Sequence, residues 1–369
     1  MPVPRPPLRC GIIGTGGIAH AHAHALTELG ADLAAVAEID PASAAAFTGR
    51  FPVPGVYGDA ETMLKEERLD LVHICTPPGT HVPLAIAAMR AGVPALVEKP
   101  TALSLAEMDE LAEVEAETGV PVLTVFQHRY GPAAIRLRRL VASGALGRPL
   151  VATCETLWYR DDAYFAVPWR GRWEVEGGGP TMGHGIHQFD LLLSILGPWT
   201  EVTAMAARLS RPTNTEDVSM ALARFDNGAM ATVVNSVVSP RETSRLRFDF
   251  EHATVELEHL YGYRAGDWRF TAAPGHEDLA GLWLAGDEPD AESGHRLQIE
   301  AVLDAIAAGT EPGVSLAEAR RTLEFAAATY ASAFQGRPVS AGEIDAADPF
   351  NRSMDGGVVP WVPIKETFA

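Results

Sequence analysis

The chain has 369 residues, a formal net charge of −19 at pH 7 and three cysteines. This length suits about two domains, each able to bury a substantial core. The negative charge disfavours nucleic acid and anionic membranes as partners, and no run approaches the roughly 18 apolar residues of a membrane span. The odd cysteine count favours buried thiols in a reducing compartment, so we expect a cytoplasmic protein.

The first third of the chain alternates short apolar runs with alanine-rich amphipathic stretches. The predicted strands are "LRCGII", "DLAAVAEI", "LDLVHICT", "VPALVEK" and "VPVLTVF", with a further strand near Val56 and Tyr57. Near-continuous apolar strands are typical of a parallel sheet that helices cover on both faces. The sequence therefore predicts an α/β fold whose first part, residues 1–127, is a doubly wound Rossmann domain.

A glycine motif, "CGIIGTGGIA", follows the first predicted strand and opens a helix, which gives Gly14, Gly16 and Ala19 the GxGxxG/A spacing. Gly14 permits a tight turn, Gly16 lets the backbone approach a pyrophosphate, and Ala19 lets the helix pack closely on the strand. The motif predicts a dinucleotide site. Its predicted contact residues are Gly14, Thr15, Gly16, Gly17 and Ile18.

Glu38 ends the next predicted strand. Its carboxylate can accept hydrogen bonds from both ribose hydroxyls of the adenosine and would repel a 2′-phosphate. Ile39 beside it offers no cation that could hold such a phosphate. We therefore expect NAD rather than NADP, although a solvated acid at the end of a strand is the alternative interpretation of Glu38.

Three histidines alternate with alanine directly after the glycine motif, at His20, His22 and His24. On a helix, His20 and His24 share a face while His22 points nearly opposite, so at most two could bind one metal ion. A zinc site needs further ligands, and neither a cysteine nor an acidic cluster lies nearby in the sequence. We expect ordinary helix here and no metal site.

The pattern of predicted strands and helices changes after "FQHRYGP". A helix is predicted over residues 132–143, a strand near 150–158, a helix over about 181–196, and then strands of alternating character such as "GAMATVVNSVV" and "SRLRFDF". Two helices close the chain, at about 294–308 and 315–335. Residues 128–369 are thus predicted to form an α+β domain with a large open, mainly antiparallel sheet. A sheet face without helices predicts a homodimer or homotetramer.

Further motifs follow in order: "ICTPPGTH", "AGVPALVEKP", "FQHRYGP", "VPWRGRW" and "GGGPTMGHGIHQFD". Together with the glycine motif, they resemble the Gfo/Idh/MocA family of NAD(P)-dependent sugar and cyclitol oxidoreductases. The resemblance spans roughly Leu8 to Gly197, and the EKP of the second motif is its most specific element. The later strands and helices resemble the family only in their general pattern.

The resemblance implies that Lys99 of EKP is the central catalytic residue, near the nicotinamide ribose and the reacting oxygen. An ammonium at the carboxyl end of a strand can stabilise negative charge on a substrate oxygen, and partial burial can lower its pKa. The alternative is a lysine that only pairs with Glu98. By the same resemblance, Glu98 and Lys99 both belong to the cofactor-binding set.

His187 matches the family's histidine that exchanges a proton with the substrate hydroxyl, and imidazole titrates near neutral pH. A buried structural histidine is the alternative. Many family members carry Asp or Asn four residues earlier, where this chain has Gly183. Either Lys99 and His187 act without that partner, or His184 or Arg160 supplies a substrate contact, or the chemistry is altered.

The resemblance also implies further cofactor contacts, which are Thr76, Pro77, His81, Gln127, Trp169 and Arg170. The planar guanidinium group of Arg170 can donate hydrogen bonds to a carboxamide or a phosphate. A structural ion pair is an equal alternative for this residue.

These features predict an NAD-dependent dehydrogenase that oxidises a secondary alcohol of a sugar, an inositol or a related polyol. Hydride would pass to the nicotinamide while His187 takes the hydroxyl proton and Lys99 polarises the oxygen. Two alternatives stay open: an NAD-using glycosidase of the same fold, and a non-catalytic dinucleotide-binding sensor resembling a corepressor.

Overall fold

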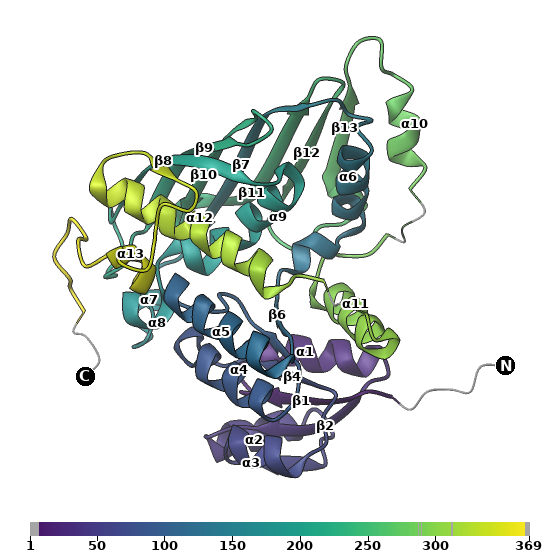
Figure 1. The fold of residues 1–369 in the computed structure, drawn as a ribbon, viewed down its shortest axis with the longest axis vertical. Helices are drawn as coiled ribbons and strands as arrows, with labels where there is room; N and C mark the ends of the chain where they lie inside the picture. Colours follow the sequence, from purple (N-terminus) through teal and green to yellow (C-terminus); the bar gives the residue numbers. More distant parts are fainter. Residues whose placement is uncertain (1–6, 287, 289, 311–312, 366–369) are drawn as a thin grey trace. The chain divides into compact units, whose positions relative to one another are not determined.

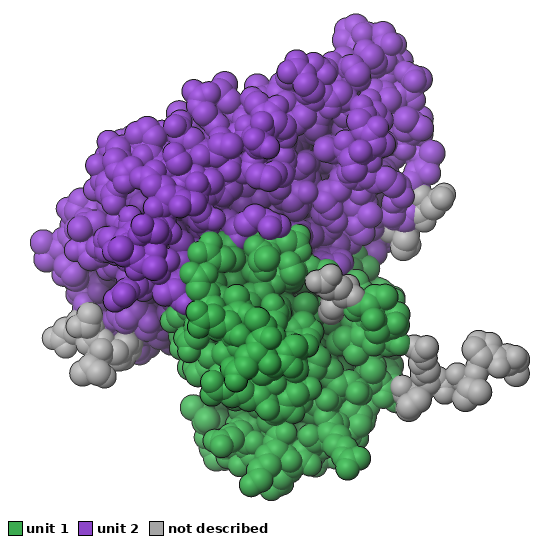
Figure 2. Space-filling view, viewed as in Figure 1, with its two compact units in different colours: residues 1–102, 107–125, 295–320 green, residues 103–106, 126–294, 321–369 purple. Residues whose placement is uncertain are grey.

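The computed structural model describes residues 7–286, 288, 290–310 and 313–365 (Figure 1). The chain divides into two compact units (Figure 2). The first comprises residues up to Ala102, Glu107–Val125 and His295–Arg320, and the second comprises Leu103–Ala106, Phe126–Gly294 and the chain from Arg321 onward. Among the described residues, no helix combines the length and the hydropathy that a membrane span requires.

The first unit contains a six-stranded parallel sheet in the order β3-β2-β1-β4-β5-β6. Its strands are β1 (Arg9–Ile13), β2 (Asp32–Ala37), β3 (Gly55–Tyr57), β4 (Leu71–Ile74), β5 (Ala95–Val97) and β6 (Val122–Thr124). The order reverses between β1 and β4, and in such sheets ligands bind at this switch point, outside the carboxyl ends of the strands. The predicted Rossmann domain is confirmed.

Helices flank this sheet. They are α1 (Gly17–Glu28), α2 (Pro41–Thr48), α3 (Ala60–Glu66), α4 (His81–Arg90), α5 (Leu105–Thr118) and α11 (His295–Ala308). The side chains of Asp40 and Asp59 cap α2 and α3 by accepting hydrogen bonds from the first turn of each helix. The core joins α1 to α11, because Ala23 and Leu26 lie in one buried cluster with Ile299. A segment that the sequence assigned to residues 128–369 therefore packs with the first unit.

The second unit contains an eight-stranded sheet in the order β13-β12-β11-β7-β10-β9-β8-β14. Its strands are β7 (Pro149–Tyr159), β8 (Trp199–Ala207), β9 (Val218–Phe225), β10 (Met230–Ser236), β11 (Val238–Phe250), β12 (Ala253–His259), β13 (Trp268–Ala272) and β14 (Val339–Ser340). The β7–β10 pair is parallel, and the other neighbouring pairs are antiparallel. This confirms the predicted mainly antiparallel sheet.

The helices of this unit are α6 (Pro132–Ala142), α7 (Asp162–Phe165), α8 (Trp173–Glu176), α9 (Ile186–Leu196), α10 (Leu279–Leu284), α12 (Leu316–Gln335) and α13 (Pro349–Arg352). Helices α9 and α12 lie along one face of the sheet (Figure 1), where Phe189 and Trp199 both pack on Phe325. Residues of β9 alternate between buried and exposed, as a strand covered on one face must. The opposite face exposes apolar side chains, among them Leu222.

Candidate active site

The glycine motif forms the turn between β1 and α1. Gly14 has φ +85°, and a Cβ at this position would lie 2.8 Å from Cγ2 of Thr76. In contrast, a Cβ on Gly16 or Gly17 would meet nothing within 4 Å. Open space thus faces the first turn of α1, where a helix leaves N–H groups without intrahelical partners. These residues fit a dinucleotide pyrophosphate, and the fully buried Ala19 explains the small third position of the motif.

Glu38, directly after β2, is bound to the same turn. Its Oε2 accepts hydrogen bonds from the backbone N–H of Thr15 at 2.8 Å and from the Thr15 hydroxyl at 2.9 Å. Partial burial works to raise the pKa of Glu38, but hydrogen bonds from the backbone of Asp40 and from Thr15 lower it below its usual value. Glu38 is therefore a carboxylate at neutral pH, able to accept hydrogen bonds from ribose hydroxyls.

The "TPPGTH" loop follows β4. Thr76 and Pro77 lie in this loop, and the Thr80 hydroxyl donates to Oγ1 of Thr76 at 2.7 Å. His81 is fully buried, with ring nitrogens 2.7 Å from the carbonyl oxygen of Pro100 and 2.8 Å from that of Thr76. His81 therefore joins this loop to the loop that follows β5, so its ring is directed at backbone rather than at open space.

Lys99 lies two residues beyond the end of β5 and is half-buried. Gly14, Glu38, Thr76 and Lys99 follow β1, β2, β4 and β5 respectively. In a parallel sheet, the carboxyl ends of neighbouring strands lie at one edge, on both sides of the switch point. The fold thus brings the predicted phosphate, ribose and catalytic residues of the first unit to the same edge.

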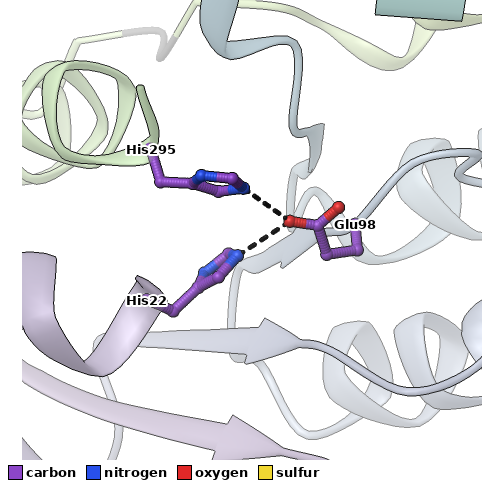
Figure 3. A group of neighbouring side chains, drawn as sticks. All are labelled: His22, Glu98 and His295. Atoms are coloured by element: carbon purple, nitrogen blue, oxygen red, sulfur yellow. Dashed lines mark hydrogen bonds and ion pairs between the residues drawn. The ribbon is translucent and has the colours of Figure 1, made fainter. Parts of the chain in front are cut away.

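The middle histidine of the alternating tract, His22, is buried beside Glu98. Its Nε2 lies 2.9 Å from Oε1 of Glu98, and Nε2 of His295 lies 3.0 Å from the same oxygen (Figure 3). The ligand atoms of these three residues lie within 4.8 Å of one another, so the group could hold a metal ion. His20 and His24 instead pack on Phe47 and Phe51, on the other side of the helix.

No sequence pattern indicates this group of three residues. Glu98 lies 76 residues after His22, and His295 lies 197 residues after Glu98. Ligand spacing within a motif is readable from sequence, but ligands that three separate elements bring together are not.

In the second unit, His187 lies in the first turn of α9 and is 6% exposed. Its ring centroid lies 5.5 Å from that of His128 and 5.9 Å from that of Tyr261. Gln127, which is fully buried, donates from Nε2 to the Tyr261 hydroxyl. We call His128, His187 and Tyr261 the histidine–tyrosine cluster. Sequence reasoning missed two of its members, although His128 directly follows the predicted Gln127.

Gly183 lies in a π-helical turn, Thr181–Gly185, that runs directly into α9. Such turns occur frequently at functional sites. A Cβ on Gly183 would meet nothing within 4 Å, so packing does not require glycine here. The ring of the next residue, His184, lies 5.0 Å from that of Trp158 and 6.1 Å from that of Tyr164. Gly183 and His184 line the same small pocket, so an imidazole borders the open space beside Gly183.

A buried carboxyl group holds this turn in place. Glu216 is fully buried and accepts hydrogen bonds from the backbone N–H of Gly179 at 2.9 Å, from that of Thr181 at 3.1 Å and from the Tyr330 hydroxyl at 2.8 Å. Burial raises the pKa of Glu216 to about 7, although each of the first two bonds works to lower it. The segment before His184 and His187 is thus fixed by contacts within the same unit.

The two predicted arginines are stacked and paired. The guanidinium carbon of Arg170 lies 4.0 Å from the ring centroid of Tyr164 and 4.2 Å from that of Trp169, and its Nη1 lies 3.3 Å from Glu176. Arg160 is similar, with an acidic partner from β11 at 2.9 Å and a tryptophan ring centroid at 4.9 Å. The structural ion pair considered for Arg170 therefore exists.

Comparison with known proteins extends these observations. Residues 8–126 match the family model described as "Oxidoreductase family, NAD-binding Rossmann fold", and residues 134–256 match the model described as "GFO/IDH/MocA C-terminal domain". The D-apiose dehydrogenase of Paraburkholderia graminis is 28% identical over 368 residues, which cover 94% of this chain and 93% of that protein.

The other similar proteins include an inositol dehydrogenase and a dehydrogenase of known structure. The inositol 2-dehydrogenase of Rubrobacter xylanophilus is 35% identical over 144 residues, which cover 38% of this chain and 41% of that protein. The crystal structure of the WlbA dehydrogenase from Bordetella pertussis, in complex with NADH and UDP-GlcNAcA, is 25% identical with a TM-score of 0.81. That similarity covers 91% of this chain and 99% of the other.

Proposed function

This chain belongs to the Gfo/Idh/MocA family of NAD-binding oxidoreductases, and from that premise we propose that it oxidises a secondary alcohol of a sugar, a cyclitol or a related polyol with NAD. The observation that carries this proposal is the set of Gly14, Glu38 and Lys99 at one edge of the parallel sheet. Three cysteines are buried and form no disulfide bond, namely Cys10, Cys75 and Cys154. Free thiols are typical of a reducing compartment, and we therefore propose that the protein is cytoplasmic.

Each site residue has a distinct task in this reaction. Gly14 to Ile18 would hold the pyrophosphate, Glu38 the adenosine ribose, and Thr76 and Pro77 the adjoining crevice. When bound, the nicotinamide supplies the hydride acceptor. Lys99 donates a hydrogen bond to the substrate oxygen and stabilises the negative charge that develops there. His187 accepts the hydroxyl proton as a neutral imidazole.

A substrate survey tests the activity. Purified protein is mixed with NAD and with D-apiose, inositols, aldoses and glucosides in turn, and NADH formation is followed by its absorbance. At least one polyol should give NADH in proportion to the enzyme concentration. Cleavage of a glycoside without net NADH would instead identify the glycosidase, and tight dinucleotide binding without turnover on any member would identify the sensor.

The choice of NAD over NADP depends on Glu38. In Glu38→Ala, the Kd for NAD should rise about 10- to 100-fold, since hydrogen bonds to a charged group contribute about 1.5–3 kcal/mol. The Kd for NADP should fall or stay constant, because the repulsive charge is gone. Calorimetric titration with each cofactor measures both values. The exposed acid Glu66 provides the matched control as Glu66→Ala, and equal NAD affinity in Glu38→Ala and the wild type would refute the assignment.

We also propose that two copies of the chain associate through the uncovered face of the eight-stranded sheet. Its exposed apolar side chains are Val151 (47% exposed), Met205 (78%), Met220 (54%), Leu222 (61%) and Met230 (50%). A neighbouring strip on β11, β12 and β13 carries paired arginines and glutamates. A face with apolar side chains and both signs of charge can complement itself across a two-fold axis.

Light scattering tests this association. Leu222→Asp places a charge in the centre of the apolar face and should convert the wild-type oligomer to a monomer. Leu284 is 79% exposed but lies on α10, away from this face, so Leu284→Asp should keep the oligomer. A monomeric wild-type protein at micromolar concentration would contradict the association.

A further inference from the structure

Glu98, the residue before the proposed catalytic lysine, is the centre of a buried polar network in the first unit. Its other members are His22 on α1, His73 on β4 and His295 at the start of α11. His22 and His73 are fully buried, Glu98 is 5% exposed, and the side chain of His295 is 11% exposed. The proposed oxidation uses none of the three histidines.

Both carboxylate oxygens of Glu98 accept hydrogen bonds. Oε1 lies 2.9 Å from Nε2 of His22 and 3.0 Å from Nε2 of His295 (Figure 3), and Oε2 accepts the backbone N–H of Lys99 at 3.1 Å. Burial alone raises the pKa of Glu98, but the two imidazoles outweigh it and hold that pKa well below its usual value. An ionised carboxylate only accepts, so each of these histidines carries a proton on Nε2.

The protonation of the third histidine follows from the second. Burial lowers the pKa of His22 and of His73, so both rings are neutral at pH 7. A neutral His22 with its proton on Nε2 has a lone pair on Nδ1, and this atom lies 2.8 Å from Nδ1 of His73. His73 must therefore donate from Nδ1. The network runs in one direction, from His73 through His22 to Glu98.

This arrangement favours hydrogen bonds over a metal ion. A bound metal would need the Nε2 lone pairs of His22 and His295, which the network uses as N–H donors. Metal–ligand bonds of about 2.0–2.2 Å separate tetrahedral ligand atoms by roughly 3.3–3.6 Å. The observed 2.9 Å and 3.0 Å are the distances of hydrogen bonds to a charged acceptor.

We propose that Glu98 is a positioning residue, which holds the backbone of Lys99 and ties it to the cofactor-binding helix α1 through His22 and to α11 through His295. This inference rests on the proposed function, because it assigns Lys99 a place in catalysis. One carboxylate fixes three elements whose residues are far apart in the chain. The backbone of Lys99 at the end of β5 thus shares this carboxylate with α1 and α11.

An isosteric variant tests the positioning. In Glu98→Gln, the side-chain oxygen can face the imidazoles or the Lys99 N–H, but the amide NH₂ then opposes the remaining donors. We expect kcat to fall about 10- to 100-fold, the equivalent of losing hydrogen bonds to a charged group. The Kd for NAD, measured by calorimetry, should change less than about threefold. Glu110→Gln, an exposed position on α5, is the matched control.

Equal kcat in Glu98→Gln and the wild type would overturn the positioning role. Failure of the wild-type protein to turn over any polyol would instead overturn the proposed function, so the two failures are distinguishable. A second measurement does not depend on activity or on the folding of a variant. Ring ¹⁵N shifts of the wild-type histidines should report protons on Nε2 of His22 and His295 and on Nδ1 of His73, unchanged by added zinc. Stoichiometric metal in the purified protein, or zinc-dependent shifts of these rings, would overturn the network.

Discussion

Replacing Lys99 with alanine is expected to lower kcat for polyol oxidation by about 10²- to 10³-fold, the usual effect of removing one donor from a developing oxyanion. The ammonium is the proposed source of that stabilisation, and methyl cannot replace it. Cofactor binding should persist, because the glycine turn and Glu38 follow other strands, β1 and β2. Steady-state rates measured with saturating NAD, together with calorimetry, separate the two effects.

Lys65, an exposed lysine on α3, supplies the matched control for this substitution. Lys65→Ala should retain wild-type kcat, since its charge lies outside the proposed site. Wild-type turnover in Lys99→Ala would exclude the lysine as the group that polarises the substrate oxygen.

The second large effect is expected at His187. His187→Gln keeps side-chain volume but removes the base, so kcat should fall about 10²- to 10⁴-fold. In the wild type, oxidation should slow as the pH falls, because a protonated imidazole cannot accept the hydroxyl proton. The variant should lose this decrease of the oxidation rate at low pH, which is the acidic limb of the pH–rate profile. Rates across a pH series with saturating polyol and NAD measure both predictions.

His184→Gln tests whether His184 contributes to the reaction in place of the Asp or Asn that many family members carry at the position of Gly183. If His184 only borders the open space beside Gly183, its substitution should raise KM and leave the pH limb intact. Loss of the limb in His184→Gln with its retention in His187→Gln would transfer the role of base from one histidine to the other.

Local patterns predicted the first unit well. Gly14 and Ala19 lie close together in sequence, and each is required by the backbone geometry of one strand–turn–helix, while Glu38 follows at the end of the next strand. The positive φ of Gly14 and the burial of Ala19 are therefore readable from spacing alone. The same holds for the alternating strands of the second sheet, where a period of two identifies the buried face.

Contacts between side chains from distant segments of the chain could not be predicted from the sequence. His22 was correctly placed on the opposite face from His20 and His24, but only the fold brings His73 and His295 to it. Tyr261 of the histidine–tyrosine cluster lies in the chain that follows β12, and nothing in its sequence context distinguishes it from a packing residue. Helix α11 was assigned to the second domain for the same reason, because its packing on α1 depends on where the chain returns.

Calorimetric titration of the wild-type protein with NAD tests the central claim, which is that the turn at Gly14 holds a nicotinamide dinucleotide at the end of the sheet that carries Lys99. We predict saturable binding of one NAD per chain, with NADP weaker. The absence of measurable binding heat for both dinucleotides, in protein whose fold is verified by circular dichroism, would contradict it.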